Sequence, residues 1–303
     1  MAELQDRVLV AGAGGFIGSN AVRWFAEQGC RVTALARRRR GSDARNVAWR
    51  DFPRDPAALA SLLAAEGVRA VVNCCGVVNG TPEQLAQGNE GVVRLLAAAL
   101  EAHDPDLPLV HVSSVSAGQA GTDYGASKAR GERVVKESRL TRWVILRPSL
   151  VYGPGDTKNV SVIVQAVRRF PVVPVPEKVV LQPLYVDDLF PAMAAALAGA
   201  GGWQGTYVLA GPRQESLLDM ARMVCQALGR RRLLLPVPVW PVRMALGLLG
   251  ALLPFLPRQQ AASLAGQPFW DASAASRDLG FQPRTFAAGM ARLAEAEGLA
   301  GAD

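Results

Sequence analysis

A tyrosine and a lysine four residues apart are the side chains of this sequence best suited to proton transfer. Tyr124 and Lys128 stand in a stretch with a helical pattern, so both side chains are expected on one face of a helix. A neighbouring ammonium group favours an ionised phenol, and we therefore expect Lys128 to lower the pKa of Tyr124 from about 10 toward neutral pH. A tyrosine adjusted in this way can act as a general acid and base.

Two serines precede this pair at the end of a predicted strand. The apolar run Leu109–Val112 is typical of a buried strand, and Ser113 and Ser114 follow it directly. A tyrosine and a lysine at this spacing also occur on solvated helix faces, so the spacing alone is weak evidence. The strand-end serines and the glycine turn described next make proton-transfer chemistry the stronger interpretation.

A glycine-rich turn stands near the start of the sequence. Gly12, Gly15 and Gly18 follow an apolar run, and a helical pattern begins near Phe16. Without Cβ atoms the backbone can turn tightly and approach a pyrophosphate, and a helix N-terminus offers partial positive charge to the phosphates. The spacing is Gly-x-x-Gly-x-x-Gly, because Ile17 occupies the position that would complete Gly-x-Gly-x-x-Gly. The turn predicts a dinucleotide site.

The residues after the second predicted strand indicate which nicotinamide cofactor fits. Enzymes that use NAD present Asp or Glu there, where the carboxylate binds the ribose hydroxyls. In this sequence Ala36 is followed by four arginines, residues 37–40. Guanidinium groups can bind a 2′-phosphate in a bidentate manner, which favours NADP over NAD. Arg37 and Arg38 are the expected contacts, and a solvated basic loop is the alternative.

Short β-branched runs alternate with helical patterns through the first half, which predicts an α/β fold with a Rossmann-type, doubly wound parallel sheet. The expected strands are 8–10, 31–35, 47–49, 70–73, 109–112 and 143–146, and the expected helices are 16–28, 56–66, 90–102 and 124–137. Prolines and glycines at 148–155 then break the pattern. We therefore predict a dinucleotide-binding domain over residues 1–152 and a smaller C-terminal substrate-binding domain over 153–303, with segments such as 184–211 packing back on the first.

Together these motifs resemble the extended short-chain dehydrogenase/reductase family, which includes NAD-dependent epimerases and dehydratases. The resemblance covers nearly the whole sequence and also rests on Leu146-Arg-Pro-Ser-Leu-Val-Tyr-Gly-Pro154, Pro183-Leu-Tyr-Val-Asp-Asp188 and Leu279-Gly-Phe-Gln-Pro283. It implies that Ser114 hydrogen-bonds the substrate oxygen, Tyr124 exchanges its proton and Lys128 also holds the nicotinamide ribose. Asn89 matches a helix-start asparagine near the site, for which a helix cap and a direct catalytic role are both open.

The resemblance also implies a set of cofactor contacts. The strand-end segment beside the cofactor corresponds to Asn73, Cys75 and Gly76, and the pair that contacts adenine corresponds to Asp51 and Phe52. The full expected set is Gly12, Gly15, Phe16, Ile17, Gly18, Arg37, Arg38, Asp51, Phe52, Asn73, Cys75, Gly76, Lys128 and Pro148.

Two departures separate the sequence from members that act on nucleotide-sugars. Leu150 stands where those members carry an asparagine that binds the substrate diphosphate. The interval from Ser114 to Tyr124 is short for the family, which leaves Ser113 or Ser116 as alternatives to Ser114. The short loop also gives some similarity to the nucleotide-binding accessory subunit of respiratory complex I, whose members hold the cofactor without evident turnover.

Composition argues against several other classes. The 303 residues carry a formal net charge of +7, and seven of the cations stand in two short clusters, 37–40 and 230–232, so the charge is too local for nucleic acid. Four cysteines without Cys-x-x-Cys spacing and only two histidines predict reduced thiols and no metal site. We see no signal-peptide pattern, and the longest apolar stretch, 244–256, is too short to span a bilayer. These features predict a cytoplasmic protein without an integral membrane segment, and leave open whether that stretch touches a membrane surface.

The sequence therefore predicts an NADP-dependent oxidoreductase that transfers hydride to or from a carbonyl or alcohol carbon of a small substrate, with NAD as the alternative cofactor. The apolar run 233–240 indicates a largely apolar or modified-sugar substrate. A nucleotide-sugar epimerase or dehydratase and a non-catalytic NADP-binding accessory protein are the alternatives. A homodimer is one expected assembly.

Overall fold

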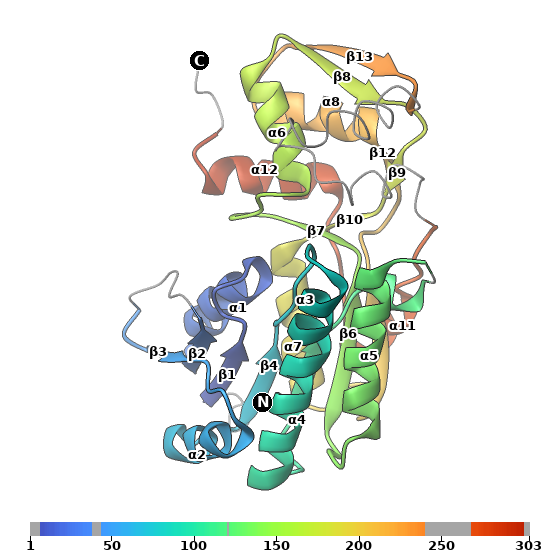
Figure 1. Cartoon of the computed structure of the whole chain (residues 1–303). Coiled ribbons are helices and arrows are strands. Elements are labelled where there is room, and N and C mark those ends of the chain that lie inside the picture. Colours follow the sequence, from blue (N-terminus) through green and yellow to red (C-terminus); the bar gives the residue numbers. More distant parts are fainter. Residues whose placement is uncertain (1–6, 38–43, 120, 240–267, 300–303) are drawn as a thin grey trace. The chain divides into compact units, whose positions relative to one another are not determined.

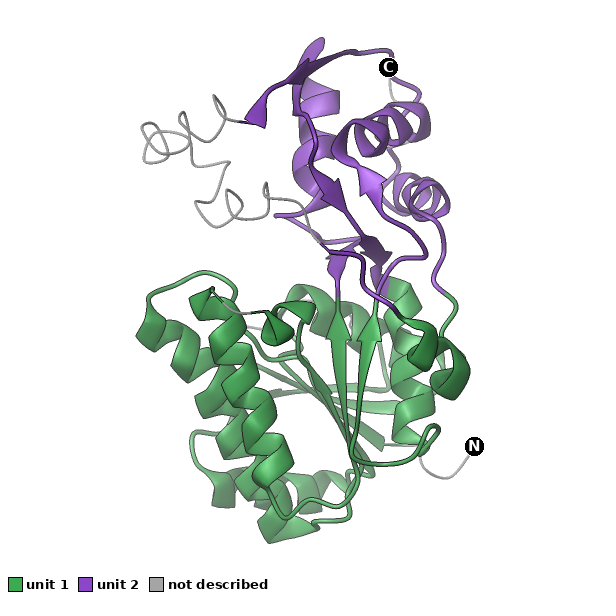
Figure 2. Cartoon of the chain, turned by 90° about the vertical axis from the view of Figure 1, so that its right-hand side faces the viewer, with its two compact units in different colours: residues 1–148, 187–209, 272–282 green, residues 149–186, 210–271, 283–303 purple. Residues whose placement is uncertain are grey.

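The computed structural model describes residues 7–37, 44–119, 121–239 and 268–299. The chain divides into two compact units (Figure 2). Unit 1 contains Met1–Pro148, Asp187–Leu209 and Ala272–Gln282, and unit 2 contains Ser149–Val186, Ala210–Asp271 and Pro283–Asp303. The end of the first segment of unit 1, Pro148, lies close to the boundary predicted after residue 152. The segment predicted to pack back on the first domain, 184–211, overlaps Asp187–Leu209, which belongs to unit 1.

A seven-stranded parallel sheet forms the centre of unit 1 and confirms the predicted α/β fold (Figure 1). Its strands are β1 (Arg7–Ala11), β2 (Arg31–Ala36), β3 (Val47–Asp51), β4 (Ala70–Asn73), β5 (Leu109–Val112), β6 (Trp143–Pro148) and β11 (Gly205–Leu209). They lie in the order β11-β6-β5-β4-β1-β2-β3. The order reverses between β1 and β4, and the carboxyl ends of strands at such a switch point are the usual place for a ligand.

Helices cover both faces of this sheet (Figures 1 and 2). Helices α2 (Pro56–Glu66), α4 (Val92–His103) and α5 (Asp123–Glu137) lie on one face, and α1 (Phe16–Glu27), α7 (Leu189–Leu197) and α11 (Ser273–Leu279) lie on the other. Leu63 of α2, Leu96 of α4 and Val135 of α5 share one buried cluster with Leu9 and Val71 of the sheet. Because helices bury both faces of the sheet, the sequences of its strands are nearly continuous runs of apolar residues.

The helical segment that was predicted to begin at residue 90 begins earlier, at Pro82. Helix α3 (Pro82–Ala86) starts with a capping box, in which Thr81 and Gln84 exchange side-chain hydrogen bonds with each other's backbone N–H groups. A π-helical turn, Gln87–Gly91, then continues into α4. This wide turn interrupts the 3.6-residue period, which explains why the pattern in the sequence became clear only from residue 90.

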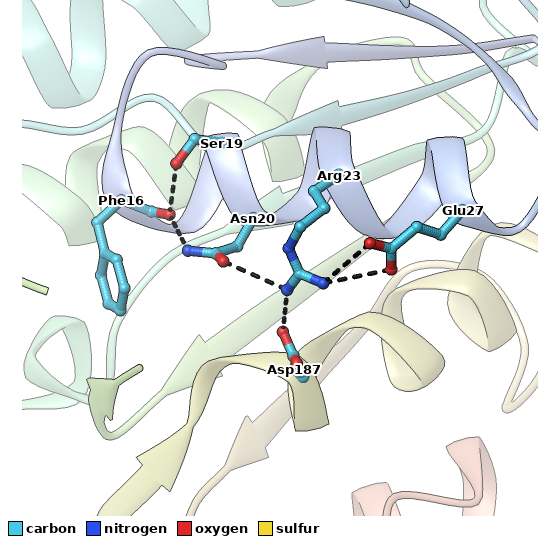
Figure 3. Close-up of polar contacts among 6 residues, drawn as sticks. All are labelled: Phe16, Ser19, Asn20, Arg23, Glu27 and Asp187. Atoms are coloured by element: carbon cyan, nitrogen blue, oxygen red, sulfur yellow. Dashed lines mark hydrogen bonds and ion pairs between the residues drawn. The ribbon is translucent and has the colours of Figure 1, made fainter. Parts of the chain in front are cut away.

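Helix α1 is tied to the segment that returns from unit 2. Arg23 Nη2 donates to Asp187 Oδ1 at 2.6 Å, and the same nitrogen lies 3.4 Å from Asn20 Oδ1 (Figure 3). Asn20 Nδ2 in turn donates to Phe16 O at 2.9 Å, within the first turn of α1. These contacts hold the helix that directly follows the glycine turn.

Unit 2 consists of short strands and helices around its own apolar core. Its elements are β7 (Leu150–Tyr152), α6 (Val160–Arg169), β8 (Val172–Pro176), β9 (Val180–Leu181), β10 (Pro183–Tyr185), β12 (Glu215–Ser216), α8 (Leu217–Ala227), β13 (Leu233–Val237) and α12 (Phe286–Ala296). The strands pair as β10 with β7, β12 with β9, and β13 with β8. Tyr152 lies at the centre of the core, where its hydroxyl donates to Phe286 O at 3.2 Å.

Two features of the sequence cannot be placed on this fold. The apolar stretch 244–256 and residue Arg38 lie outside the described residues. Within the part of the chain that is described, no helix is both long enough and apolar enough to cross a membrane.

Replacing Gly18 with alanine should destabilise unit 1, because a Cβ at this position would lie 2.2 Å from Gly12 O. That neighbour is backbone, so the turn itself must shift, and overpacking of this kind costs about 1–3 kcal/mol. Gly15→Ala is the matched control, since its Cβ would lie 3.3 Å from the same oxygen, and we expect a loss below about 1 kcal/mol. Denaturant unfolding followed by tryptophan fluorescence measures both variants, and equal losses would contradict this account of the turn.

Candidate active site

The glycine turn between β1 and α1 is packed too closely for side chains. The N–H groups of Gly12 and Ala13 both donate to Leu35 O, at 3.1 and 3.0 Å. Gly12 has a φ of +80°, and a Cβ there would lie 2.7 Å from Cys75 N in the loop after β4. The turn is thus pressed against the ends of β2 and β4, as a backbone that must approach a ligand requires.

The start of α1 is free to receive an anion. Gly15 is the N-cap residue and provides no side-chain hydrogen bond to the helix. The first N–H groups of a helix have no hydrogen-bond acceptor within the helix. In α1 these groups belong to the first turn, which begins with Phe16 and Ile17, both partly buried. The pyrophosphate of a nicotinamide dinucleotide fits this combination of close-packed glycines and an uncapped helix start.

The loop after β4 is held by a buried asparagine. Asn73 Oδ1 accepts a hydrogen bond from Cys75 N at 3.0 Å, and Asn73 Nδ2 lies 3.0 Å from His111 Nδ1. Burial lowers the pKa of His111 well below its usual value, so its ring is neutral and Nδ1 accepts. Burial also raises the pKa of Cys75 to about 12, which leaves a protonated thiol. Gly76 follows, and a Cβ there would lie 3.6 Å from Lys128 Nζ.

Ser114 is the serine that lies beside the tyrosine. Tyr124 is in the first turn of α5 and is partly buried, and the Ser114 side chain acts to lower its pKa, which places the two hydroxyl groups near each other. Ser114 Oγ also accepts from Ser116 N at 3.1 Å, which fixes its position. Ser113 Oγ donates to Glu132 Oε1 at 2.6 Å in the protein interior. Of the three serines left open by the sequence, Ser114 is therefore the one that the structure brings to Tyr124.

Lys128 does not act on Tyr124 as the spacing predicted. Its side chain is buried, and Nζ donates to Val112 O at 2.8 Å. Burial raises the pKa of Tyr124 above its usual value near 10, and the nearby Ser114 side chain opposes this only in part. The predicted lowering of the phenol pKa is therefore wrong, because the spacing of two residues does not reveal how deeply they are buried. Burial also lowers the pKa of Lys128 itself to about 8, against the raising effect of nearby acidic groups such as Glu132.

A buried carboxylate that sequence reasoning missed supports these residues. Glu132 Oε1 accepts from Arg147 Nε at 2.8 Å, and Oε2 accepts from Arg147 Nη2 at 2.6 Å. Burial alone would raise the pKa of Glu132, but the hydrogen bonds from Arg147 and Ser113 lower it below the usual value. We call Ser113, Glu132 and Arg147 the Glu132 cluster. Two signals pointed to it: Glu132 follows Lys128 by one helical turn, and Arg147 stands in the Leu-Arg-Pro motif.

Asn89 connects α5 to the loop after β4. It lies in the π-helical turn and is fully buried. Its Oδ1 accepts from Val77 N at 2.8 Å, and its Nδ2 donates to Val77 O at 2.8 Å and to Ser127 Oγ at 2.9 Å. The helix-cap interpretation is wrong, because the helix begins earlier, at Pro82. Both N–H donors of the amide are used within the protein, which indicates a structural role.

The residues expected at the adenosine half of the cofactor stand at the ends of β2 and β3. Arg37 is exposed directly after β2, and its positive charge acts to lower the pKa of Cys75, which places the two near each other. Asp51 is the exposed last residue of β3, and Phe52 after it is partly buried against the core. Arg38 lies outside the described residues.

The expected site residues thus gather at one edge of the sheet. They occupy the carboxyl ends of β1, β2, β3, β4, β5 and β6, and buried Pro148 ends β6. Phe16, Ile17 and Gly18 are the first residues of α1, and Tyr124 and Lys128 come from α5, which follows β5. Among the residues that the structure describes, no three His, Cys, Asp or Glu side chains are grouped to hold a metal ion.

Comparison with known proteins agrees with this geometry. A model of the NAD dependent epimerase/dehydratase family matches residues 8–210. The ceramide reductase of Caulobacter vibrioides is 33% identical over 178 residues, which make up 55% of this chain and 53% of that protein. A UDP-glucose 4-epimerase of Vibrio cholerae is 26% identical over a stretch covering 38% of its length. The chain therefore spans about half the length, or less, of the curated relatives it matches.

Two solved structures share the fold over nearly the whole chain. The UDP-glucose 4-epimerase of Thermotoga maritima, solved with UDP-glucose, aligns with a TM-score of 0.75 at 18% identity over 95% of this chain and 97% of its own. The Bordetella bronchiseptica enzyme WbmG, solved with NAD, aligns with a TM-score of 0.77 at 15% identity over 97% of this chain and 95% of its own. Because the family match runs from β1 through β11, the resemblance to the extended short-chain dehydrogenases/reductases is confirmed, and the chain belongs to the NAD dependent epimerase/dehydratase family.

Proposed function

We propose that this protein is an NADP-dependent oxidoreductase of the extended short-chain type, which transfers hydride to or from a carbonyl or alcohol carbon of a small, largely apolar substrate. The observation that carries the proposal is the position of Tyr124, Ser114 and Lys128 at the same sheet edge as the glycine turn. An accessory protein that only holds the cofactor would have no need for a Ser-Tyr pair there. A small-molecule partner, a homodimer and a cytoplasmic location stay predictions from the sequence.

The chain offers a distinct group to each part of the cofactor. A bound nicotinamide cofactor supplies or accepts hydride at C4 of its ring. The glycine turn and the start of α1 would receive the pyrophosphate, and Lys128, whose Nζ lies near Gly76, would hold the nicotinamide ribose. Exposed Arg37 at the end of β2 is suited to a 2′-phosphate, which distinguishes NADP from the NAD held by WbmG.

Tyr124 carries the proton that carbonyl reduction consumes. Because burial holds its pKa above 10, the phenol is protonated at neutral pH and can donate to the substrate oxygen as the alcohol forms. The Ser114 hydroxyl, which acts on the pKa of Tyr124, would orient the same oxygen. Alcohol oxidation requires the phenolate instead, so the reverse reaction should be faster at alkaline pH than at neutral pH.

Two observations support an apolar substrate, namely the aliphatic side chain of Leu150 and the similarity to a curated relative. Leu150 in β7 is partly buried and packs against the apolar core of that unit, and an aliphatic side chain cannot donate hydrogen bonds to a diphosphate. The curated relative with 33% identity is a ceramide reductase, which supports a lipid-like substrate. A ceramide carries secondary alcohol groups, so a ketone derived from a ceramide has the carbonyl that the proposed reaction needs.

Replacing Tyr124 with phenylalanine should lower turnover by roughly 10²–10⁴-fold, the usual worth of a positioned acid, while leaving cofactor affinity nearly unchanged. Lys128→Met should weaken both turnover and cofactor binding, because we propose that this ammonium group holds the nicotinamide ribose. Steady-state kinetics and fluorescence titration of the cofactor separate the two effects.

The matched control is Tyr207→Phe, since the Tyr207 hydroxyl donates to Gly201 O within unit 1 and stands outside the proposed site. In the wild type, carbonyl reduction should be constant from acidic to neutral pH and fall only on the alkaline side, as Tyr124 loses its proton. Wild-type turnover by Tyr124→Phe, or a rate of reduction that rises with pH, would show that another group supplies the proton.

Replacing Arg37 with alanine should weaken NADP binding by about 10-fold or more, the worth of a charge-assisted hydrogen bond, and leave NAD binding unchanged. Arg31→Ala is the matched control, because Arg31 is an exposed arginine at the opposite end of the same strand, β2. Calorimetric titration of both cofactors against all three proteins provides the test. Equal NADP and NAD affinities that neither substitution alters would exclude the NADP assignment and favour NAD.

The cofactor-loaded protein should turn over long-chain aliphatic ketones and bind UDP-glucose poorly. The reason is Leu150, which would bury phosphate charge without compensating hydrogen bonds. Calorimetry and cofactor absorbance against UDP-glucose, a long-chain ketone and a ketone derived from ceramide compare the two classes. Micromolar binding and turnover of UDP-glucose would replace this proposal with a nucleotide-sugar epimerase or dehydratase.

A further inference from the structure

Strands β8 and β13 form a two-stranded ribbon in unit 2 (Figure 1), and the outer face of this ribbon is apolar. Along β8, Val173 and Val175 point inward and are buried. Val172, the first residue of β8, is 44% exposed. In the parallel register Val172 pairs with Leu233, which is 62% exposed. Leu235, two residues further along β13, is 49% exposed and therefore shares this outer face.

This outer face lacks the polar residues that normally meet water. A sheet with one buried face usually alternates apolar residues inside with polar residues outside. Here the alternate positions of both strands are apolar throughout: Val172, Pro174, Leu233 and Leu235 are exposed, and Pro176 and Val237 are partly buried. Phe170, directly before β8, is 51% exposed and extends the surface. Contiguous exposed apolar patches of this kind mark interaction sites.

The apolar face is bordered by two arginine clusters that the fold brings together. Arg168 and Arg169 end α6, and residues 230–232 precede β13. Arg232 Nε donates to Val167 O at 2.7 Å, which joins the start of β13 to the end of α6. Over residues 168–178 and 230–237 the sequence has six Lys or Arg residues against one acid, Glu177. The border of the apolar face is therefore strongly positive.

We propose that this surface, the outer face of β8 and β13 with its arginine border, docks on a lipid bilayer that contains anionic headgroups. Apolar side chains bind the acyl boundary, while arginines can extend along it and pair with phosphates. The charge complementarity is what singles out this occupant. The proposal goes beyond the reaction in unit 1 and holds whichever substrate is reduced there.

A second copy of the chain fits this surface less well. A symmetric pair places the same patch of both copies face to face, which would bring two arginine borders together. Strand addition at the ribbon edges is also disfavoured, because Pro174 and Pro176 in β8 and Pro236 in β13 lack the N–H groups that a further strand would need.

Vesicle flotation with the full-length protein tests the proposal. We expect the wild type to float with vesicles of phosphatidylcholine containing phosphatidylglycerol, and to float much less with pure phosphatidylcholine. High salt should weaken the binding, because the arginine contribution is screened. The double variant Arg168→Gln, Arg231→Gln should reduce partitioning by roughly 30-fold, at about 1 kcal/mol for each arginine near the surface.

The double variant Leu233→Ser, Leu235→Ser tests the apolar part of the surface and should abolish flotation, because both side chains point outward. Unchanged cofactor binding and thermal unfolding would show that this variant is folded. Matched controls are Val78→Ser, at an apolar position 49% exposed in unit 1, and the double variant Arg133→Gln, Arg142→Gln, at exposed arginines in unit 1. Both controls should float like the wild type.

Three results would overturn the proposal. The first is absence of wild-type flotation, and the second is equal flotation with and without the anionic lipid. The third is a wild type that is dimeric in sedimentation velocity and a Leu233→Ser, Leu235→Ser variant that is monomeric, when neither protein binds vesicles. The last result would assign the surface to a second copy of the chain. Because flotation is read without substrate, failure of the proposed reaction would leave this test unaffected.

Discussion

The burial of the Lys128 ammonium group is the constraint on which the rest of unit 1 depends. Only 3% of this residue is exposed, and a charged amine taken out of water is costly unless other groups replace the water. The Val112 carbonyl accepts one of its N–H groups, and Glu132 places negative charge one helical turn further along α5. Glu132 is itself buried and stays ionised through Arg147 and Ser113. Buried charged and polar groups thus gather where β5, α5 and β6 meet, and removing Arg147 would leave the Glu132 carboxylate in the interior without its main partner.

The same groups determine what the sheet edge presents to a ligand. Because Ser113 is held inward by Glu132, its neighbour Ser114 is the serine that meets Tyr124. Lys128 stands next to Gly76, where a Cβ would also lie 3.2 Å from Asn89 Oδ1. The loop after β4, the start of α5 and the glycine turn are therefore fixed relative to one another by buried contacts within unit 1. A site prepared in this way can hold a cofactor and a proton donor without reorganising them, which is the condition for efficient acid catalysis.

Much of unit 1 could be predicted from the sequence, because its signals are local. Strands β4 and β5 have the predicted ends, since buried parallel strands read as apolar runs, and close packing explains Gly12 and Gly18. The pKa of Tyr124 could not be predicted, because it depends on burial and not on the distance to Lys128 along the chain. The Glu132 cluster was missed because it requires β6 to lie beside α5. In unit 2, β8 and β13 were not predicted; prolines within a run disfavour a strand, yet a two-stranded ribbon tolerates them at its edges.

Deuterium transfer tests the central claim most directly, namely that the Ser114, Tyr124 and Lys128 site serves net carbonyl reduction. The protein is incubated with a reduced NADP cofactor deuterated on the transferable position of C4 and with a ketone derived from ceramide, and the products are analysed by mass spectrometry. Our account predicts that deuterium appears on the carbinol carbon of the lipid, with one oxidised cofactor formed for each alcohol. Deuterium that remains in the cofactor, or turnover of a nucleotide-sugar with no net oxidation of the cofactor, would contradict it.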